Sequence, residues 1–212
     1  MLKFDTQSPI TATVEVAAAE VTVIATDRTD AIVHIRPADP AKKADVRAAE
    51  QTQVDFTAGV LTVQTPKTWR TKTAFGGTPS IQVTLEIPTA STLNATAAVG
   101  RLIALGPIGE SDLQISAGDI HVERPLGSVK AKTAKGDIRI AEASRGILTL
   151  ETSTGEIEVG IRPGSLARVE TNAANGTVHN QMAPTDPQSG DIVQVNAHNA
   201  FGNIVIGHVV AV

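Results

Sequence analysis

The 212-residue chain contains no cysteine, which excludes disulfides and thiolate metal sites. Aromatic residues make up only 2% of the chain, although hydrophobic residues make up 42%. Large aromatic side chains normally fill the irregular space of a globular interior. Their scarcity therefore predicts a narrow, regular interior filled by stacked Val, Ile, Leu, Ala and Thr side chains.

No apolar run approaches the roughly 18 residues needed to cross a bilayer, so membrane insertion is not expected. The opening Met1–Asp5 lacks an apolar stretch behind a basic start. No secretory signal is predicted from this sequence, and a cytoplasmic location is the simplest expectation. The net charge of −4 gives no global basic field, so nucleic acid is not favoured as a partner.

Glycines followed by an apolar-x-apolar pair recur through the second half of the chain. Their spacings are 18, 18, 19, 21 and 26 residues, and the glycines are Gly100, Gly118, Gly136, Gly155, Gly176 and Gly202. A second alternating run precedes each glycine. Each unit therefore reads as a strand, a glycine corner, another strand and a turn, and glycine suits the corner because it adopts positive φ freely.

The period of the repeat indicates the architecture. About 18 residues at roughly 3.3 Å each make a loop near 60 Å around, which suits one solenoid coil. A single coil cannot bury its apolar face alone, so stacking is required. Stacking predicts two buried ladders, Ile120/Ile138/Ile157 and Val122/Ile140/Val159. A meander of hairpins is the alternative, and it explains the alternation but not the near-constant period.

We therefore predict an all-β fold in which residues 91–212 form a β-solenoid with roughly 18-residue rungs. Residues 1–90 are predicted to form irregular β-strands, either as degenerate rungs of the same solenoid or as a separate small domain. Asp39–Asp45 is predicted to be a turn or a short helix, because an Asp cap and a proline open it.

The chain resembles a bacterial family of unknown function that is called the β-strand-repeat putative adhesin family. The resemblance rests on Phe4 and Pro9-Ile10 followed by Val14-x-Val16, and on T-x-x-G-D-I-x-[V/I] rungs such as 133–140. It covers nearly the whole chain. The resemblance implies a repeated β-strand fold, an adhesion role and no catalytic motif.

The loop from Pro66 to Pro79 concentrates charge and aromatic residues. Its candidate ligand-binding residues are Lys67, Trp69, Arg70, Lys72 and Phe75. A cation beside an exposed ring is a common recognition element for acidic or planar ligands, which indicates a glycan or polyanion site. The favoured alternative is that the two aromatic residues cover an open end of the solenoid.

Asp119, Asp137 and Glu156 follow the corner glycine in three successive coils. Stacked carboxylates could bind Ca²⁺, which takes six to eight oxygen ligands. A solvated outer ladder is the favoured interpretation, because the chain lacks the Gly-Gly-x-Gly-x-Asp run of calcium-binding β-rolls. No metal and no cofactor are therefore expected.

Other stacked positions are assigned structural roles. Lys132 is expected opposite Glu151, and Arg139 between His121 and Glu158, where opposite charges on neighbouring strands stabilise the coil register. A threonine ladder of Thr133, Thr152 and Thr171 is expected to face inward. His121 and His179 are expected three coils apart, about 14 Å, which is too far to share a metal.

The sequence contains no H-E-x-x-H, G-x-S-x-G or phosphate-loop motif, so no enzymatic activity is expected. The expected function is a non-catalytic scaffold or protein-interaction module that forms homo-oligomers, because a solenoid leaves two open ends. The alternative is a glycan- or polyanion-binding module that uses the Trp69 loop. A polysaccharide-acting β-helix enzyme is less favoured, because such enzymes need charged clusters beside sugar-stacking aromatics.

Overall fold

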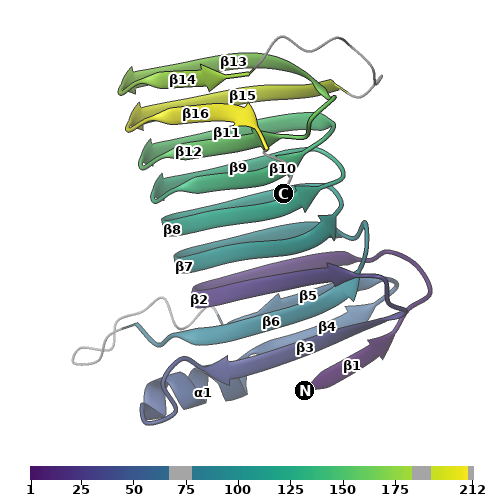
Figure 1. The fold of residues 1–212 in the computed structure, drawn as a ribbon. Coiled ribbons are helices and arrows are strands. Elements are labelled where there is room, and N and C mark those ends of the chain that lie inside the picture. Colours follow the sequence, from purple (N-terminus) through teal and green to yellow (C-terminus); the bar gives the residue numbers. More distant parts are fainter. Residues whose placement is uncertain (67–77, 183–191, 210–212) are drawn as a thin grey trace.

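The computed structural model describes residues 1–66, 78–182 and 192–209 of the chain. These residues form one 16-stranded sheet, which winds into a β-solenoid, and one helix (Figure 1). The prediction of an all-β solenoid is therefore confirmed. The elements are β1 (Leu2–Asp5), β2 (Thr11–Thr26), β3 (Asp30–Pro37), α1 (Lys43–Gln51), β4 (Gln53–Thr57), β5 (Val60–Gln64), β6 (Ile81–Pro88), β7 (Thr92–Ile108), β8 (Ser111–Pro125), β9 (Val129–Lys135), β10 (Ile138–Ala143), β11 (Gly146–Thr154), β12 (Ile157–Ile161), β13 (Leu166–Asn175), β14 (Val178–Gln181), β15 (Ile192–Phe201) and β16 (Ile204–His208).

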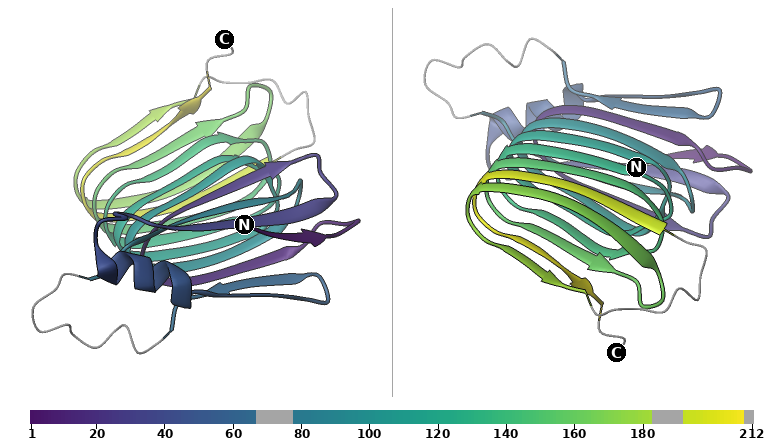
Figure 2. Two further views of the ribbon diagram at one scale, coloured as in Figure 1. Left: turned by 90° about the horizontal axis from the view of Figure 1, so that it is seen from below. Right: turned by 90° about the horizontal axis from the view of Figure 1, so that it is seen from above.

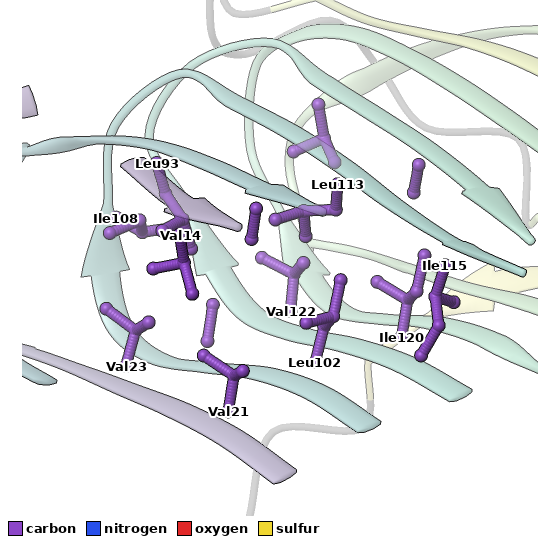
Figure 3. Close-up of a cluster of buried hydrophobic side chains, with 14 of the residues drawn as sticks. Val14, Val21, Val23, Leu93, Leu102, Ile108, Leu113, Ile115, Ile120 and Val122 are labelled. Carbon is purple, nitrogen blue, oxygen red and sulfur yellow. The ribbon is translucent and has the colours of Figure 1, made fainter. Parts of the chain in front are cut away.

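The interior is a column of aliphatic side chains, because alternate residues of every coil point inward. In the described part of the chain, every buried hydrophobic residue is Ala, Val, Ile or Leu. Ile138 lies between Ile120 and Ile157, and all three are at most 1% exposed. The same holds for the ladder of Val122, Ile140 and Val159, so both predicted ladders are confirmed. Figure 3 shows side chains from β2, β7 and β8 meeting in this shared core.

The chain does not stack its last coils in sequence order. β15 and β16 lie between β11/β12 and β13/β14, so the coil nearest the C-terminus in sequence is the penultimate coil in space (Figure 1). The spacing predicted for the two histidines is therefore wrong. His121 and His179 lie four strand steps apart, about 19 Å at roughly 4.8 Å per step, rather than three.

The corner glycines stack directly on one another, which is why no larger residue is used there. A Cβ atom added to Gly136 would lie well under 3.0 Å from the carbonyl oxygen of Gly118. A Cβ atom added to Gly202 would be equally close to the carbonyl oxygen of Gly155, and one added to Gly176 would be equally close to that of Gly202. Gly136 has φ of +143°, as the sequence predicts for a corner. Gly176 has no positive φ, so close approach alone requires glycine at that corner.

Polar side chains inside the column satisfy the carbonyl groups of this glycine stack. The Thr133 hydroxyl donates to the Gly118 oxygen at 3.1 Å, and the Thr152 hydroxyl donates to the Gly136 oxygen at 3.0 Å. Both threonines are at most 2% exposed, which confirms that they face inward. The prediction that Thr171 continues this ladder is wrong. Asn199 lies opposite Thr152, and Thr171 lies opposite Ala197.

Replacing Thr152 with valine is expected to lower the free energy of unfolding by about 1–3 kcal/mol. Valine keeps the shape of threonine but leaves the half-buried Gly136 carbonyl without its hydroxyl donor. Urea denaturation followed by circular dichroism measures the change. The matched control is Thr149→Val on the exposed face of the same strand, and an equal loss in both variants would contradict the role of the hydrogen bond.

Candidate interaction surface at the open end of the solenoid

The far end of the column is formed by β13 and β14, each of which has a strand partner on one side only among the described residues. β13 pairs in parallel with β15, and β14 pairs in parallel with β16. Within residues 1–66, 78–182 and 192–209, no strand pairs with the other edge of either one. Unpaired N–H and C=O groups along such an edge are a template for pairing with another chain.

The hydrophobic column reaches this end without being closed. Leu148 and Val195 are fully buried, but Val169, which continues their row in β13, is only half-buried. Val178 in β14 is 42% exposed. The last coil therefore presents both free backbone groups and part of the aliphatic core. The right-hand view of Figure 2 looks down on this end of the column.

The opposite end of the column is partly covered and finishes in short edge strands. β3 runs antiparallel between β1 and β6, and α1 lies beside β3 and β6 (Figure 2). Ala48 of α1 is buried in the core. The outermost strands β1 and β4 have four and five residues and one strand partner each among the described residues. The buried Asp45 side chain accepts hydrogen bonds from the backbone N–H of Ser80 at 3.0 Å and of Asp39 at 3.2 Å. α1 begins at Lys43, within the segment where a turn or short helix was predicted.

An ionic cluster links β1, β3 and β6 at this N-terminal end of the column. Asp30 in β3 pairs with Arg28 and with Lys3 of β1, and Arg28 also pairs with Glu86 of β6. The hydrogen bonds from Arg28 and Lys3 lower the pKa of Asp30. Burial alone would lower the pKa of Arg28, but its hydrogen bonds to the two carboxylates raise it further than burial lowers it.

Charges on the outer face pair from coil to coil along the middle of the column. Lys132 Nζ lies 2.9 Å from Glu151 Oε1, and Arg139 Nη1 lies 3.4 Å from Glu158 Oε2, as predicted. His121 lies opposite Arg139, and its pKa is lowered by burial and then by that cation. These charged groups hold the register of neighbouring coils.

The last coil carries charges without such a neighbour. Arg168 and Glu170 are exposed on the outer face of β13, and they lie opposite the uncharged Gln194 and Asn196 of β15. Neither side chain forms an ion pair or hydrogen bond with the described residues. Nothing in the repeat pattern shows that the coil of Arg168 and Glu170 is terminal, so these two residues cannot be singled out from the sequence.

The three stacked carboxylates form a structural ladder along the corner. Asp119 Oδ1 accepts the backbone N–H of Asp137 at 3.0 Å, and Asp137 Oδ1 accepts that of Glu156 at 2.7 Å. Asn203 continues the ladder by donating to Glu156 Oε1 at 3.3 Å. Each carboxylate therefore holds the corner of the next coil. Nowhere in the described segments do three or more His, Asp or Glu side chains form a group that could hold a metal.

Replacing Asp137 with alanine is expected to lower the free energy of unfolding by about 0.5–1.5 kcal/mol. Asp137→Asn is expected to retain most of this stability, because its amide oxygen still accepts the N–H of Glu156. Thermal unfolding of both variants with and without added Ca²⁺ measures the difference. A Ca²⁺-dependent rise in stability that both substitutions abolish would contradict the ladder role and restore the calcium interpretation.

The candidate residues Lys67, Trp69, Arg70, Lys72 and Phe75 lie outside the described residues, so their arrangement stays a prediction. The last described residue before them, Pro66, lines a hollow of about 260 Å³. Its other lining residues are Glu15, Val16, Ala17, Gln64, Thr65 and Thr96. Gln64 Nε2 donates to Glu15 Oε2 at 2.6 Å across two paired strands, so this hollow has a polar wall. No helix of the described chain is long and apolar enough to cross a bilayer.

Comparison with protein-family models decides the family. Residues 82–201, more than half of the chain, match the model described as Toastrack DUF4097. The chain belongs to the Toastrack DUF4097 family. The resemblance to a putative adhesin family of unknown function is thereby confirmed. No curated protein matches the chain in sequence.

Solved structures show the fold of this Toastrack chain. A crystal structure described as a putative cell adhesion protein from Clostridium sporogenes has a TM-score of 0.55 and 9% identity, over 96% of this chain and 95% of that one. A structure described as a putative adhesin from Bacteroides fragilis has a TM-score of 0.47 and 13% identity, over 97% and 95%. At such identities the first of these likenesses establishes the fold alone.

Proposed function

We propose that this Toastrack protein is a non-catalytic scaffold that self-associates through its open end, the edge formed by β13 and β14. The observation that carries the proposal is the contrast between the two ends of the column. At one end α1 packs beside the antiparallel strands, and the outermost strands β1 and β4 are only four and five residues long. At the other end the outermost strand β13 has ten residues and pairs with no described strand along its second edge. An edge of this length favours pairing with another strand.

Association at this end would satisfy two physical needs together. The free N–H and C=O groups of β13 would gain partners, and half-buried core residues such as Val169 would leave water. Burial of apolar surface contributes roughly 25 cal/mol per Å². An adhesion role, which the family resemblance implies, fits a surface that pairs with another protein chain.

The scaffold interpretation, rather than an enzymatic one, is supported by how the charged groups are used. Asp119 and Asp137 along the corner accept backbone hydrogen bonds, and Glu151 and Glu158 on the outer face of the middle coils pair with lysine or arginine. Groups used in this way hold coils together and are not arranged around a reacting atom.

Sedimentation velocity across a concentration series tests the proposal. The wild-type chain is expected to self-associate, and Val169→Lys is expected to be monomeric because an inward-facing charge at the edge opposes strand pairing. Val99→Lys is the matched control, because Val99 is 52% exposed and lies in β7, away from the open end. A strictly monomeric wild-type chain at the highest concentration would overturn the proposal.

A second candidate function is glycan or polyanion binding beside the polar hollow at Pro66. The observation that favours it is the hollow itself, whose wall includes Glu15 and Gln64 and leads into the segment that carries Trp69 and Arg70. An array of glycans and polyanions tests this function. We expect the double variant Trp69→Ala/Arg70→Ala to bind none of the glycans or polyanions that the wild-type chain binds. If the wild-type chain binds no member of the array, this second candidate function is overturned.

A further inference from the structure

We propose that the partner at the open end is a second copy of this chain, paired antiparallel through β13 about a two-fold axis at Val169. This inference rests on the proposed function and adds the strand orientation, the register and the size of the assembly. It is carried by the charge pattern of β13, by the alternation of inward and outward residues along it, and by the short edge strands of the N-terminal end.

The two faces of β13 restrict the possible registers. Residues directly opposite one another in an antiparallel pair lie on the same face of the sheet. In a two-fold pair of identical strands, an inward-facing residue must therefore lie opposite another inward-facing residue, and an outward-facing residue must lie opposite another outward-facing one. This condition places the axis at a residue and not between two residues.

The charges of β13 then select one register among those that remain. With the axis at Val169, Arg168 of each chain lies opposite Glu170 of the other, which gives two ion pairs. An axis at Arg168 would place two arginines opposite each other, and an axis at Glu170 would place two glutamates opposite each other. An axis at Thr171 would leave both charged residues opposite uncharged ones.

The same register continues the structure of the column. The middle coils join their outer charges across strand boundaries, as Lys132 and Glu151 do at 2.9 Å. Arg168 and Glu170 lie opposite uncharged residues on β15, so among directly opposite strand positions only the free side of β13 remains for opposite-charge partners in the described part of the chain. Val169 would meet its own copy on the inner face, which continues the row of Leu148 and Val195.

The assembly is expected to stop at two chains. A two-fold contact uses the same surface on both subunits, so the open end of each chain is consumed by the other. The ends that remain are the N-terminal ones, where α1 packs on β3 and β6 and the edge strands β1 and β4 are only four and five residues long. Such short edge strands offer little backbone for pairing with another chain. A closed dimer is therefore expected rather than a filament.

Single cysteine variants test the register cleanly, because the natural chain has no cysteine. At the axis, the two Val169 Cα atoms would lie about 4.5–5.5 Å apart, which is within disulfide range. Val169→Cys is therefore expected to form a covalent dimer under mild oxidation. The matched control Asn172→Cys would place its two sulfurs about 20 Å apart along the strands, so it is expected to stay uncrosslinked.

Charge exchange supplies an independent measurement. Arg168→Glu and Glu170→Arg are each expected to weaken the dimer at least about tenfold, because each places like charges opposite one another. The double variant Arg168→Glu/Glu170→Arg restores both pairs in reverse and is expected to dimerise like the wild type.

The outcomes separate the two proposals. A wild-type dimer that crosslinks no better through Val169→Cys than through Asn172→Cys, and that the double exchange does not restore, would overturn this register but leave self-association intact. Association beyond a dimer would overturn the closed assembly. A wild-type chain that stays monomeric in the sedimentation series would overturn both proposals.

Discussion

Replacing Gly136 with alanine is expected to lower the free energy of unfolding by about 2–6 kcal/mol, through backbone strain and overpacking together. Gly136 has φ of +143°, a conformation that side-chain-bearing residues rarely adopt. Its added methyl group would also collide with the carbonyl of Gly118, which is backbone and cannot rotate away. Urea denaturation followed by circular dichroism measures the loss.

Gly59→Ala separates the two causes of that loss. Gly59 also has a positive φ, at +78°, but nothing lies within 4 Å of an added Cβ. Its expected cost is about 1–2 kcal/mol, the strain of a left-handed backbone alone. Equal losses in the two variants would show that backbone strain, and not the stacking of glycines, explains why the corners need glycine.

Replacing Ile138 with alanine is expected to lower the free energy of unfolding by about 2–5 kcal/mol. The side chain is fully buried between Ile120 and Ile157, so its removal leaves a cavity that two neighbouring coils line. Coils held at a fixed strand spacing cannot collapse into this space.

Ile147→Ala is the matched control for this cavity. Ile147 is 47% exposed on the outer face of β11, so its loss is expected to change stability by less than about 0.5 kcal/mol. Chemical denaturation of both variants under the same conditions provides the comparison. A similar loss in both would contradict the view that the inner aliphatic ladder carries the stability of the fold.

The ladders of the central coils could be predicted from sequence because two independent patterns agree there. Alternation of apolar and polar residues defines the inward face, and a nearly constant glycine spacing aligns one coil with the next. Ile120, Ile138 and Ile157 are consequently in register without any need to know the path of the chain between them.

The order of the last two coils could not be predicted in this way, because Gly176 and Gly202 both satisfy the corner pattern. One signal does distinguish the two coils. Asn199 lies three residues before Gly202, as Thr152 does before Gly155. The buried Asn199 amide donates to the Gly155 carbonyl at 2.7 Å. The equivalent residue of the other coil is Ala173, which cannot donate, so that coil is the poorer neighbour for Gly155.

The candidate interaction surface depends on this order and could not be recognised without it. If the coils stacked in sequence order, β15 and β16 would form the open end. β13, with Arg168, would then have a neighbouring coil on both sides. The observed order exposes β13 instead, with its self-complementary Arg168 and Glu170. Both proposals about association therefore depend on which coil is terminal.

Disulfide crosslinking within one chain measures the coil order most directly. Thr149 lies opposite Asn196, and Asn196 lies opposite Glu170, so Thr149 and Glu170 are two strands apart. Thr149→Cys/Asn196→Cys is expected to crosslink readily, since neighbouring strands lie about 4.8 Å apart. Thr149→Cys/Glu170→Cys is expected to stay reduced, at about 9.6 Å. Rapid crosslinking of the second pair and none of the first would contradict the observed order and the interaction surface built on it.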